Sequence, residues 1–216
     1  MTMNLQPSRQ PLRSTSYRSH MDDPMTAHFL SKELAQRYPS SVESIVFVCI
    51  GTDRSTGDSL GPIIGTLVQK RSLSQVHIYG TLKNPVHALN LEKTIKLIEK
   101  VHPDAFIVGI DACLGQQTSV GFIEIGNGPV RPGAGVQKKL PDVGHIHIMG
   151  IVNVGGYMEL TMLHNTRLYV VTEMANIIAD AIHYSHILRR KNHTGTRNIL
   201  TSGRPTIPDT SKQERQ

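Results

Sequence analysis

Two aspartates carry the chemistry that this sequence suggests first. Asp58 lies in a glycine-rich loop, GTDRSTGDSLGP (51–62), directly after one apolar run, and Asp111 closes another apolar run, AFIVGID (105–111). Two carboxyls in one partly desolvated site cannot both ionise easily. One therefore keeps a proton and acts as general acid, while the other acts as general base for a water molecule. The pattern predicts paired carboxylates that activate water, although the same pair could instead hold a divalent metal ion.

Each aspartate also has a simpler interpretation. Asp58 precedes a predicted helix, and aspartate is well suited to cap a helix N-terminus. Asp111 could cap a helix or form an ion pair with Arg54. A carboxylate at the end of a buried strand is costly unless it is solvated, paired or functional. The sequence alone leaves these alternatives open.

The glycine-rich loop does not match a phosphate-binding loop. That motif has four residues between its glycines and a lysine after the second one. Here five residues separate Gly51 from Gly57, Asp58 stands in the place of the lysine, and no G-x-G-x-x-G motif is present. A carboxylate repels a phosphate, so a nucleotide site is not expected. Instead, Gly57 and Gly61 are predicted to let the backbone turn tightly and present Asp58 at the sheet edge.

A third segment, VRPGAGVQKKLPDVGHIHIMGIVNVGG (130–156), combines glycines and prolines with enough apolar residues to be ordered. We expect it to fold over the site as a loop, with Gly133 and Gly135 providing the irregular backbone. Cations near the aspartates could stabilise an oxyanion or bind a substrate carboxylate. The candidates for this role are Arg54, Lys138 and Lys139, although loop lysines are usually only solvated.

His145 and His147 alternate on one predicted strand. That spacing would suit metal ligation together with the two aspartates, but a histidine at a strand edge is more often an ordinary residue. The other histidines show no usable ligand spacing. We therefore expect no cofactor, and a metal site at His145 and His147 is only an alternative.

Apolar strands alternate with amphipathic helices through the middle of the chain, which predicts a single α/β domain with a largely parallel sheet and helices on both faces. In such sheets, ligands bind beyond the carboxyl ends of the strands, where Asp58 and Asp111 are expected to converge. The predicted strands cover residues 44–51, 75–80, 105–111, 120–126 and 145–156, and the predicted helices cover 29–38, 61–71, 88–101 and 166–190.

The net charge of +6 is concentrated at the two ends of the chain. Residues 1–20 contribute +3 and residues 186–216 contribute +5, which leaves −2 for the remainder. Both basic ends are poor in large apolar residues and are expected to be disordered. We therefore predict a disordered segment 1–25, a folded domain 26–190 and a disordered tail 191–216. Solvated tails are favoured over nucleic-acid binding.

Two cysteines in 216 residues do not make a disulfide framework, which favours a reducing cytoplasm. No segment approaches the ~18–20 consecutive apolar residues of a membrane span. The first twenty residues contain no apolar core of a secretory signal. A cytoplasmic location is expected, and no membrane partner.

Five separated blocks of the sequence together resemble the sporulation protein YyaC family. The resemblance covers about residues 28–190 and excludes the two ends. That family is in turn similar to the germination protease of spore-forming bacteria and, more distantly, to the endopeptidases that mature nickel hydrogenases. The blocks are CIGTDRSTGDSLGP, GTLKNPVHALNL, GIDACLG, PGAGVQKKLPDVGHIHIMGIVNVGG and NTRL.

The resemblance implies an atypical aspartic endopeptidase whose two functional aspartates fall on Asp58 and Asp111. Its implied substrates are proteins or peptides, and small acid-soluble spore proteins are candidates. Two alternatives are a non-catalytic protein that binds peptides during sporulation and a metal-dependent maturation peptidase. The resemblance is compatible with a homo-oligomer and with a location in the forespore or spore core.

Overall fold

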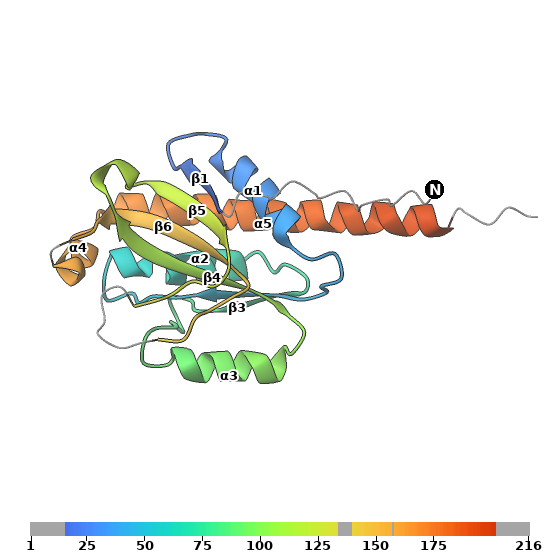
Figure 1. Ribbon diagram of the computed structural model, residues 1–216, viewed down its shortest axis with the longest axis horizontal. Helices are drawn as coiled ribbons and strands as arrows, with labels where there is room; N and C mark the ends of the chain where they lie inside the picture. Colours follow the sequence, from blue (N-terminus) through green and yellow to red (C-terminus); the bar gives the residue numbers. More distant parts are fainter. Residues whose placement is uncertain (1–15, 134–139, 157, 202–216) are drawn as a thin grey trace, which may run out of the picture.

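The computed structural model describes residues 16–133, 140–156 and 158–201, with side chains described as far as residue 190. One six-stranded sheet organises the described chain, with helices on both of its faces (Figure 1). The elements are β1 (Ser16–His20), α1 (Thr26–Arg37), β2 (Ile45–Cys49), the 3-10 turn η1 (Gly57–Ser59), α2 (Leu60–Gln69), β3 (Val76–Tyr79), α3 (Leu91–Val101), β4 (Phe106–Gly115), the 3-10 turn η2 (Gln117–Ser119), β5 (Phe122–Asn127), β6 (Ile146–Val154), α4 (Glu159–His164) and α5 (Leu168–Thr201).

The strand order is β1-β5-β6-β4-β2-β3. The pairs β2–β3, β2–β4 and β4–β6 are parallel, while β5 is antiparallel to both β1 and β6. The prediction of an α/β domain with a largely parallel sheet is confirmed. Parallel strands are buried on both faces, and all five residues of β2 are buried.

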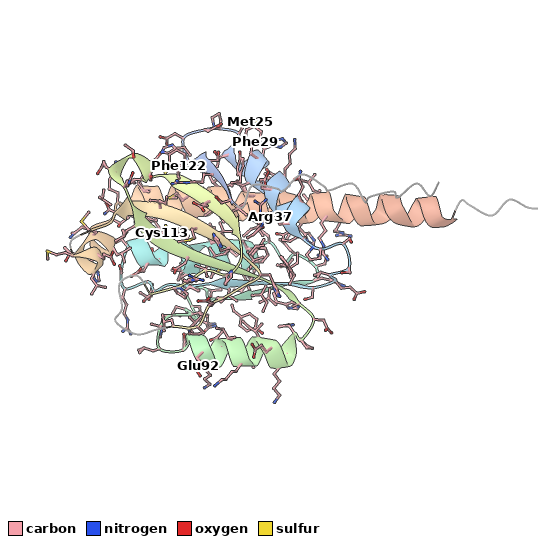
Figure 2. The ribbon with its side chains drawn as sticks, in the orientation of Figure 1. Met25, Phe29, Arg37, Glu92, Cys113 and Phe122 are labelled. Carbon is pink, nitrogen blue, oxygen red and sulfur yellow. The ribbon has the colours of Figure 1, made fainter. Side chains whose placement is uncertain are left out.

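Two apolar clusters lie on opposite faces of the sheet. The larger cluster joins α1, α2 and α5 to one face through residues such as Leu34, Ile64 and Ile178. The smaller cluster packs α3 against the other face through Leu91 and Ile98. Figure 2 shows α3 with Glu92 on its outer side, and the exposed Met25 and Phe29 at the start of α1. No helix in the described part of the chain has the length and apolarity needed to cross a bilayer.

Both predicted disordered segments include residues that belong to elements of the fold. Residues 16–20 form β1, which pairs with β5, and residues 191–201 continue α5 as far as Thr201. β1 has the sequence SYRSH, in which one residue, Ser19, is buried, so it gives no apolar signal. The strand is held in the sheet by backbone pairing with β5 rather than by burial of apolar side chains. Residues 1–15 and 202–216 lie outside the described residues.

Close backbone approaches hold α2 against the ends of the neighbouring strands. A Cβ atom on Gly61 would overlap the carbonyl oxygen of Ile50, and one on Gly65 would overlap the carbonyl oxygen of Gly80. Glycine is therefore required at both positions by space rather than by backbone angle. The helix that follows the Asp58 loop is thereby seated directly on the sheet.

We expect Gly65→Ala to destabilise the protein by about 1–3 kcal/mol, because the added methyl group would force α2 away from residue 80. Helix propensity alone predicts the opposite sign, a gain of about 1 kcal/mol. Urea unfolding followed by circular dichroism measures the difference. Lys93→Ala, at an exposed position of α3, is the control and should change stability by less than about 0.5 kcal/mol. A neutral or stabilising Gly65→Ala would contradict the close approach.

Candidate functional site

The loop that carries Asp58 closes back onto the end of β2. Ile50 continues the strand by donating its N–H to the carbonyl of Ile110 at 2.7 Å, and the N–H of Thr52 donates to the carbonyl of Asp58 at 3.1 Å. Gly51 has a φ of +142°, and a Cβ atom there would overlap the same Asp58 carbonyl oxygen. The glycine therefore lets the loop fold flat against the strand and places Asp58 beside it.

Asp58 does not cap the helix that follows it. It is the middle residue of η1, and the N-cap of α2 is Ser59, which makes no side-chain capping bond. The simpler interpretation of Asp58 as a helix cap is therefore wrong. Its carboxyl is left for other contacts.

Asp111 lies within β4 rather than at its end, which corrects the predicted strand 105–111. β4 continues to Gly115 because β6 pairs with it in parallel, with Asp111 opposite Met149 and an irregularity after Cys113. Asp111 Oδ1 accepts a hydrogen bond of 2.9 Å from the N–H of Ala112. No ion pair joins Asp111 to Arg54 among the described residues, so its side chain is not consumed by a structural salt bridge.

Asp58 and Asp111 line the same cavity, which has a volume of about 230 Å³. β2 and β4 are neighbours in the sheet, so the loop after one strand lies beside the second half of the other. Leu114, Leu140 and Leu163 make much of the wall apolar. The arrangement places two carboxyls in a small, mostly apolar recess at the carboxyl end of the parallel strands.

The surroundings of both carboxyls favour their protonated forms. Burial raises the pKa of Asp111 to about 8; the N–H of Ala112 opposes this rise, and the nearby Asp58 carboxylate adds to it. Burial also raises the pKa of Asp58, while the Ser55 hydroxyl and the His164 ring oppose that rise. Asp111 therefore keeps most of its proton at neutral pH, and the charge of the nearby Asp58 adds to this effect.

Helix α4 packs over η1, and the sequence did not predict this helix. A Cβ atom on Gly57 would lie 2.8 Å from Leu163 Cδ2 and 2.9 Å from Thr166 Oγ1, so Gly57 lets this helix pack directly on the aspartate loop. Asn153 on β6 donates to the carbonyl of Met162 at 2.9 Å and ties α4 to the sheet. This packing explains why the exposed His164 lies near enough to act on Asp58.

Other polar side chains at the cavity were not singled out from the sequence. His87, Arg131 and Glu159 line it, as does Cys113, which Figure 2 places on β4 near η1. Burial, followed by the charges of Asp111 and Glu124, raises the pKa of the Cys113 thiol to about 12, with Arg18 opposing. The thiol is therefore protonated near neutral pH and is a poor nucleophile. The NPVHALN block, which contains His87, was a signal that could have been followed.

None of the three cations predicted to stabilise an oxyanion is found in the wall of the cavity among the described residues. Arg54 is exposed and does not line the cavity, and Lys138 and Lys139 lie outside the described residues. Arg131, at 3.5 Å from Asp142, is a guanidinium that does line it. Among the predicted loop glycines, Gly133 lines the cavity, Gly57 and Gly61 support the Asp58 loop as described, and Gly135 lies outside the described residues.

His145 and His147 lie away from the aspartates. The His145 ring stacks on Phe106 at 5.0 Å, and its Nδ1 accepts the N–H of Ile107. His147 Nδ1 lies 3.0 Å from the carbonyl of Gly128. Neither ring lines the cavity, and within the described residues no three histidine, cysteine or acidic side chains are grouped to hold a metal ion. The structure does not bring these histidines to the aspartate pair.

Comparisons with known proteins identify relatives of the whole domain. A family model described as "Protein of unknown function (DUF1256)" matches residues 18–181. "Uncharacterized protein YyaC" of Bacillus subtilis (strain 168) is 48% identical over 170 residues, which cover 79% of this chain and 83% of that protein. The predicted resemblance to the YyaC family is confirmed, while the relation to germination protease stays a prediction.

Among solved structures, the chain is similar to that of a NiFe hydrogenase maturation protease, HycI from Thermococcus kodakarensis KOD1. The TM-score is 0.43 and the identity is 14%, over 67% of this chain and 95% of that one. A likeness this weak does not carry an activity from one protein to another.

We expect Asp111→Asn to stabilise the protein more at pH 8 than at pH 5. The pKa of Asp111 is about 8 in the folded state and near 4 in the unfolded state, so the folded state binds the extra proton between these values. Stability therefore falls as pH rises through this window, and asparagine removes the loss. A gain of at least about 1 kcal/mol at pH 8 would raise Tm by about 2–4 °C.

Thermal unfolding at both pH values measures this gain. Asp53→Asn changes an exposed aspartate of the same loop and serves as the control. An Asp111→Asn gain in Tm that is equal at pH 5 and pH 8 would contradict the raised pKa.

Proposed function

The chain belongs to the DUF1256 protein family, and we propose that it is a peptidase whose aspartate pair activates water for attack on a peptide bond. The observation that carries the proposal is the shared cavity of Asp58 and Asp111, in which burial raises the pKa of both carboxyls. Raised pKa values of two carboxyls in one recess are typical of acid–base sites.

The two carboxyls divide the acid and base roles by their environments. Asp111 has its pKa raised to about 8 and supplies the proton, while Asp58, whose pKa rise is opposed by Ser55 and His164, is the base. Asp58 takes a proton from water as the water oxygen bonds to the peptide carbonyl carbon. Asp111 then gives its proton to the leaving nitrogen as the C–N bond breaks, which leaves a carboxylic acid and an amine. The pair ends with its proton on the other carboxyl and regains its starting state by proton exchange with solvent.

The choice of a peptide substrate draws on two observations. Four leucine side chains lie in the wall of the aspartate cavity and suit the apolar side chains of an unfolded or flexible segment. The resemblance to the germination protease, described above, implies small acid-soluble spore proteins as the first substrates to test. Arg131 lines the same cavity, and its guanidinium could stabilise the oxyanion that forms at the carbonyl.

We expect the purified full-length chain to cleave small acid-soluble spore proteins, with the fragments identified by mass spectrometry. Asp58→Asn and Asp111→Asn should each lower the rate at least about 100-fold, because each removes one partner of the proton transfer. Asp53→Asn, in the same loop but outside the cavity, should keep the parent rate.

Full activity in the Asp58→Asn, Asp111→Asn double variant would rule out this mechanism. If the parent chain and all variants leave the substrate intact, while the parent binds it measurably, the result would instead support a non-catalytic peptide-binding protein.

The pH dependence provides a separate test of the role assignment. We expect a bell-shaped profile of kcat/KM, because activity requires one proton on the pair. Its alkaline limb should fall near pH 8, where Asp111 loses its proton. Its acid limb should lie above the ordinary pKa of an aspartate, because burial also raises the pKa of Asp58. A rate that stays constant from pH 7 to pH 10 would exclude Asp111 as the acid.

A further inference from the structure

The edge strand β3 is open to solvent on its outer side. It pairs with β2 alone within the described chain, and all four of its residues are partly exposed. In a parallel pair, half of the backbone groups of each strand point away from the partner. An edge of this kind can accept a further strand from another segment.

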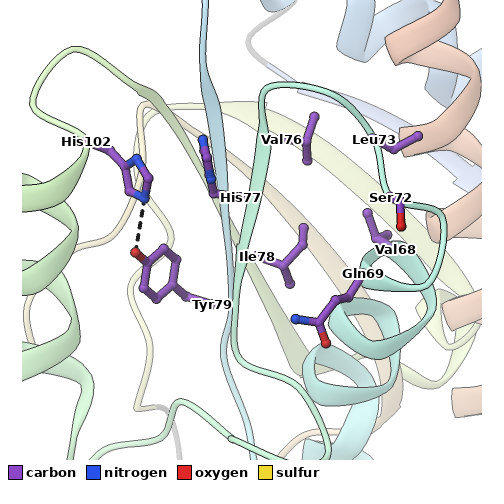
Figure 3. Close-up of a pocket in the computed structure, with 9 residues that line it drawn as sticks. All are labelled: Val68, Gln69, Ser72, Leu73, Val76, His77, Ile78, Tyr79 and His102. Atoms are coloured by element: carbon purple, nitrogen blue, oxygen red, sulfur yellow. Dashed lines mark hydrogen bonds between the residues drawn. The ribbon is translucent and has the colours of Figure 1, made fainter.

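A cavity of about 290 Å³ lies at this open edge and touches both faces of the sheet. Figure 3 shows His77 and Tyr79 on the α3 side of the strand, and Val76 and Ile78 on the α2 side. The His77 ring lies 4.1 Å from that of His102, and Tyr79 Oη lies 3.1 Å from His102 Nε2. Successive residues of a strand point to opposite faces of the sheet, and all four residues of β3 line this cavity. The cavity therefore lies beside the outer edge of the strand.

A second cavity, of about 410 Å³, continues from the first. Both are lined by Ser72 and Leu73, and the second extends to His183, His186 and Arg190 on α5. We call these two cavities together the edge groove. It shares no lining residue with the aspartate cavity, so its role is independent of the proposed peptidase site.

The edge groove offers an acidic ligand one arginine, several imidazole hydrogen-bond donors and no repelling carboxylate in its described lining. Its described lining contains one arginine and four histidines but no aspartate or glutamate. Burial, followed by neighbouring positive groups, lowers the pKa of His186, and burial followed by His77 lowers that of His102. Both rings are therefore mostly neutral near pH 7 and gain positive charge only as the pH falls. Asp180, which is also on α5, already pairs with Arg71 at 2.6 Å. An acidic ligand would therefore meet complementary charge here.

The same charges argue against occupants from this chain itself. A second copy paired through β3 would bring two grooves together that each hold an arginine and no acidic side chain in their described lining. The two ends of the sequence are also basic, since residues 1–20 contain three arginines and no acid, and residues 186–216 contain seven basic residues and two acids. Neither is complementary to the groove.

We propose that the edge groove binds an acidic segment of another protein in an extended conformation, as a further strand beside β3. Side chains of such a segment alternate between the two faces. On one face they meet His77 and His102, and on the other they meet His186 and Arg190. Backbone pairing supplies affinity, and the carboxylates select the partner.

The test uses the full-length chain and a fluorescent, capped heptapeptide of alternating glutamate and valine. Fluorescence anisotropy at pH 6, where more of the histidine rings carry a proton than at pH 7, should show binding, and amide shifts in NMR should be concentrated at residues 72–79. The corresponding lysine–valine peptide, and a glutamate–valine peptide N-methylated at alternate residues, should each bind at least about tenfold more weakly, since they lack the charge or the backbone donors.

Two protein variants make a matched pair for this experiment. Arg190→Glu changes the groove by two charges and should weaken binding at least about tenfold. Lys32→Glu makes the same change on an exposed residue of α1, outside the groove, and should alter binding by less than about twofold.

Three results would overturn the proposal. The first is equal binding of the N-methylated or the lysine peptide, and the second is equal weakening by Arg190→Glu and Lys32→Glu. The third is a dimer in sedimentation velocity whose β3 amides are protected from hydrogen exchange without peptide, because a second copy would then occupy the edge.

Discussion

The candidate site depends on the contact between the loop 51–61 and the sheet. Ile50 donates to Ile110 on β4, Thr52 donates back to the Asp58 carbonyl, and Gly51 and Gly61 leave no side chain to separate these backbones. Because a packed interior resists small displacements, this contact fixes where the Asp58 carboxyl can lie relative to β4. Asp111 then needs only to be on the neighbouring strand.

That arrangement has an energetic cost, which the rest of the domain must offset. Two carboxyls in an apolar recess are less stable than two in water, and the rise in both pKa values expresses this cost. The surrounding core is extensive: β2 is fully buried, and α2 and α5 pack on the same face of the sheet. Strained or desolvated groups usually persist where a rigid scaffold surrounds them, and such places are often functional.

Local sequence patterns predicted the parts of the fold that have strong apolar signals. The buried run of β2, the first half of β4 and the amphipathic α3 were all recognisable, because each buries side chains in its own regular period. β1 was missed because its pairing with β5 is made by the backbone of a polar segment. The extension of β4 beyond Asp111 was missed because it depends on β6, which is more than thirty residues away in sequence.

The same distinction applies to the site. Asp58 and Asp111 could be identified because glycines or an apolar strand flank them in the sequence. His164 and Arg131 could not, since only packing of α4 and of the segment after β5 brings them to the cavity region. Tertiary contacts of this kind leave no local periodicity from which they could be predicted.

The protonated state of Cys113 has a consequence for the chemical durability of the cavity. Peroxides and alkylating reagents attack a thiolate far faster than a thiol, and a pKa of about 12 leaves almost no thiolate at neutral pH. The sulfur therefore contributes volume and polarisability to the wall beside Asp111 while remaining resistant to oxidation. A hydrolase that relies on the two carboxyls would therefore not share the sensitivity to thiol reagents of one that depends on a cysteine nucleophile.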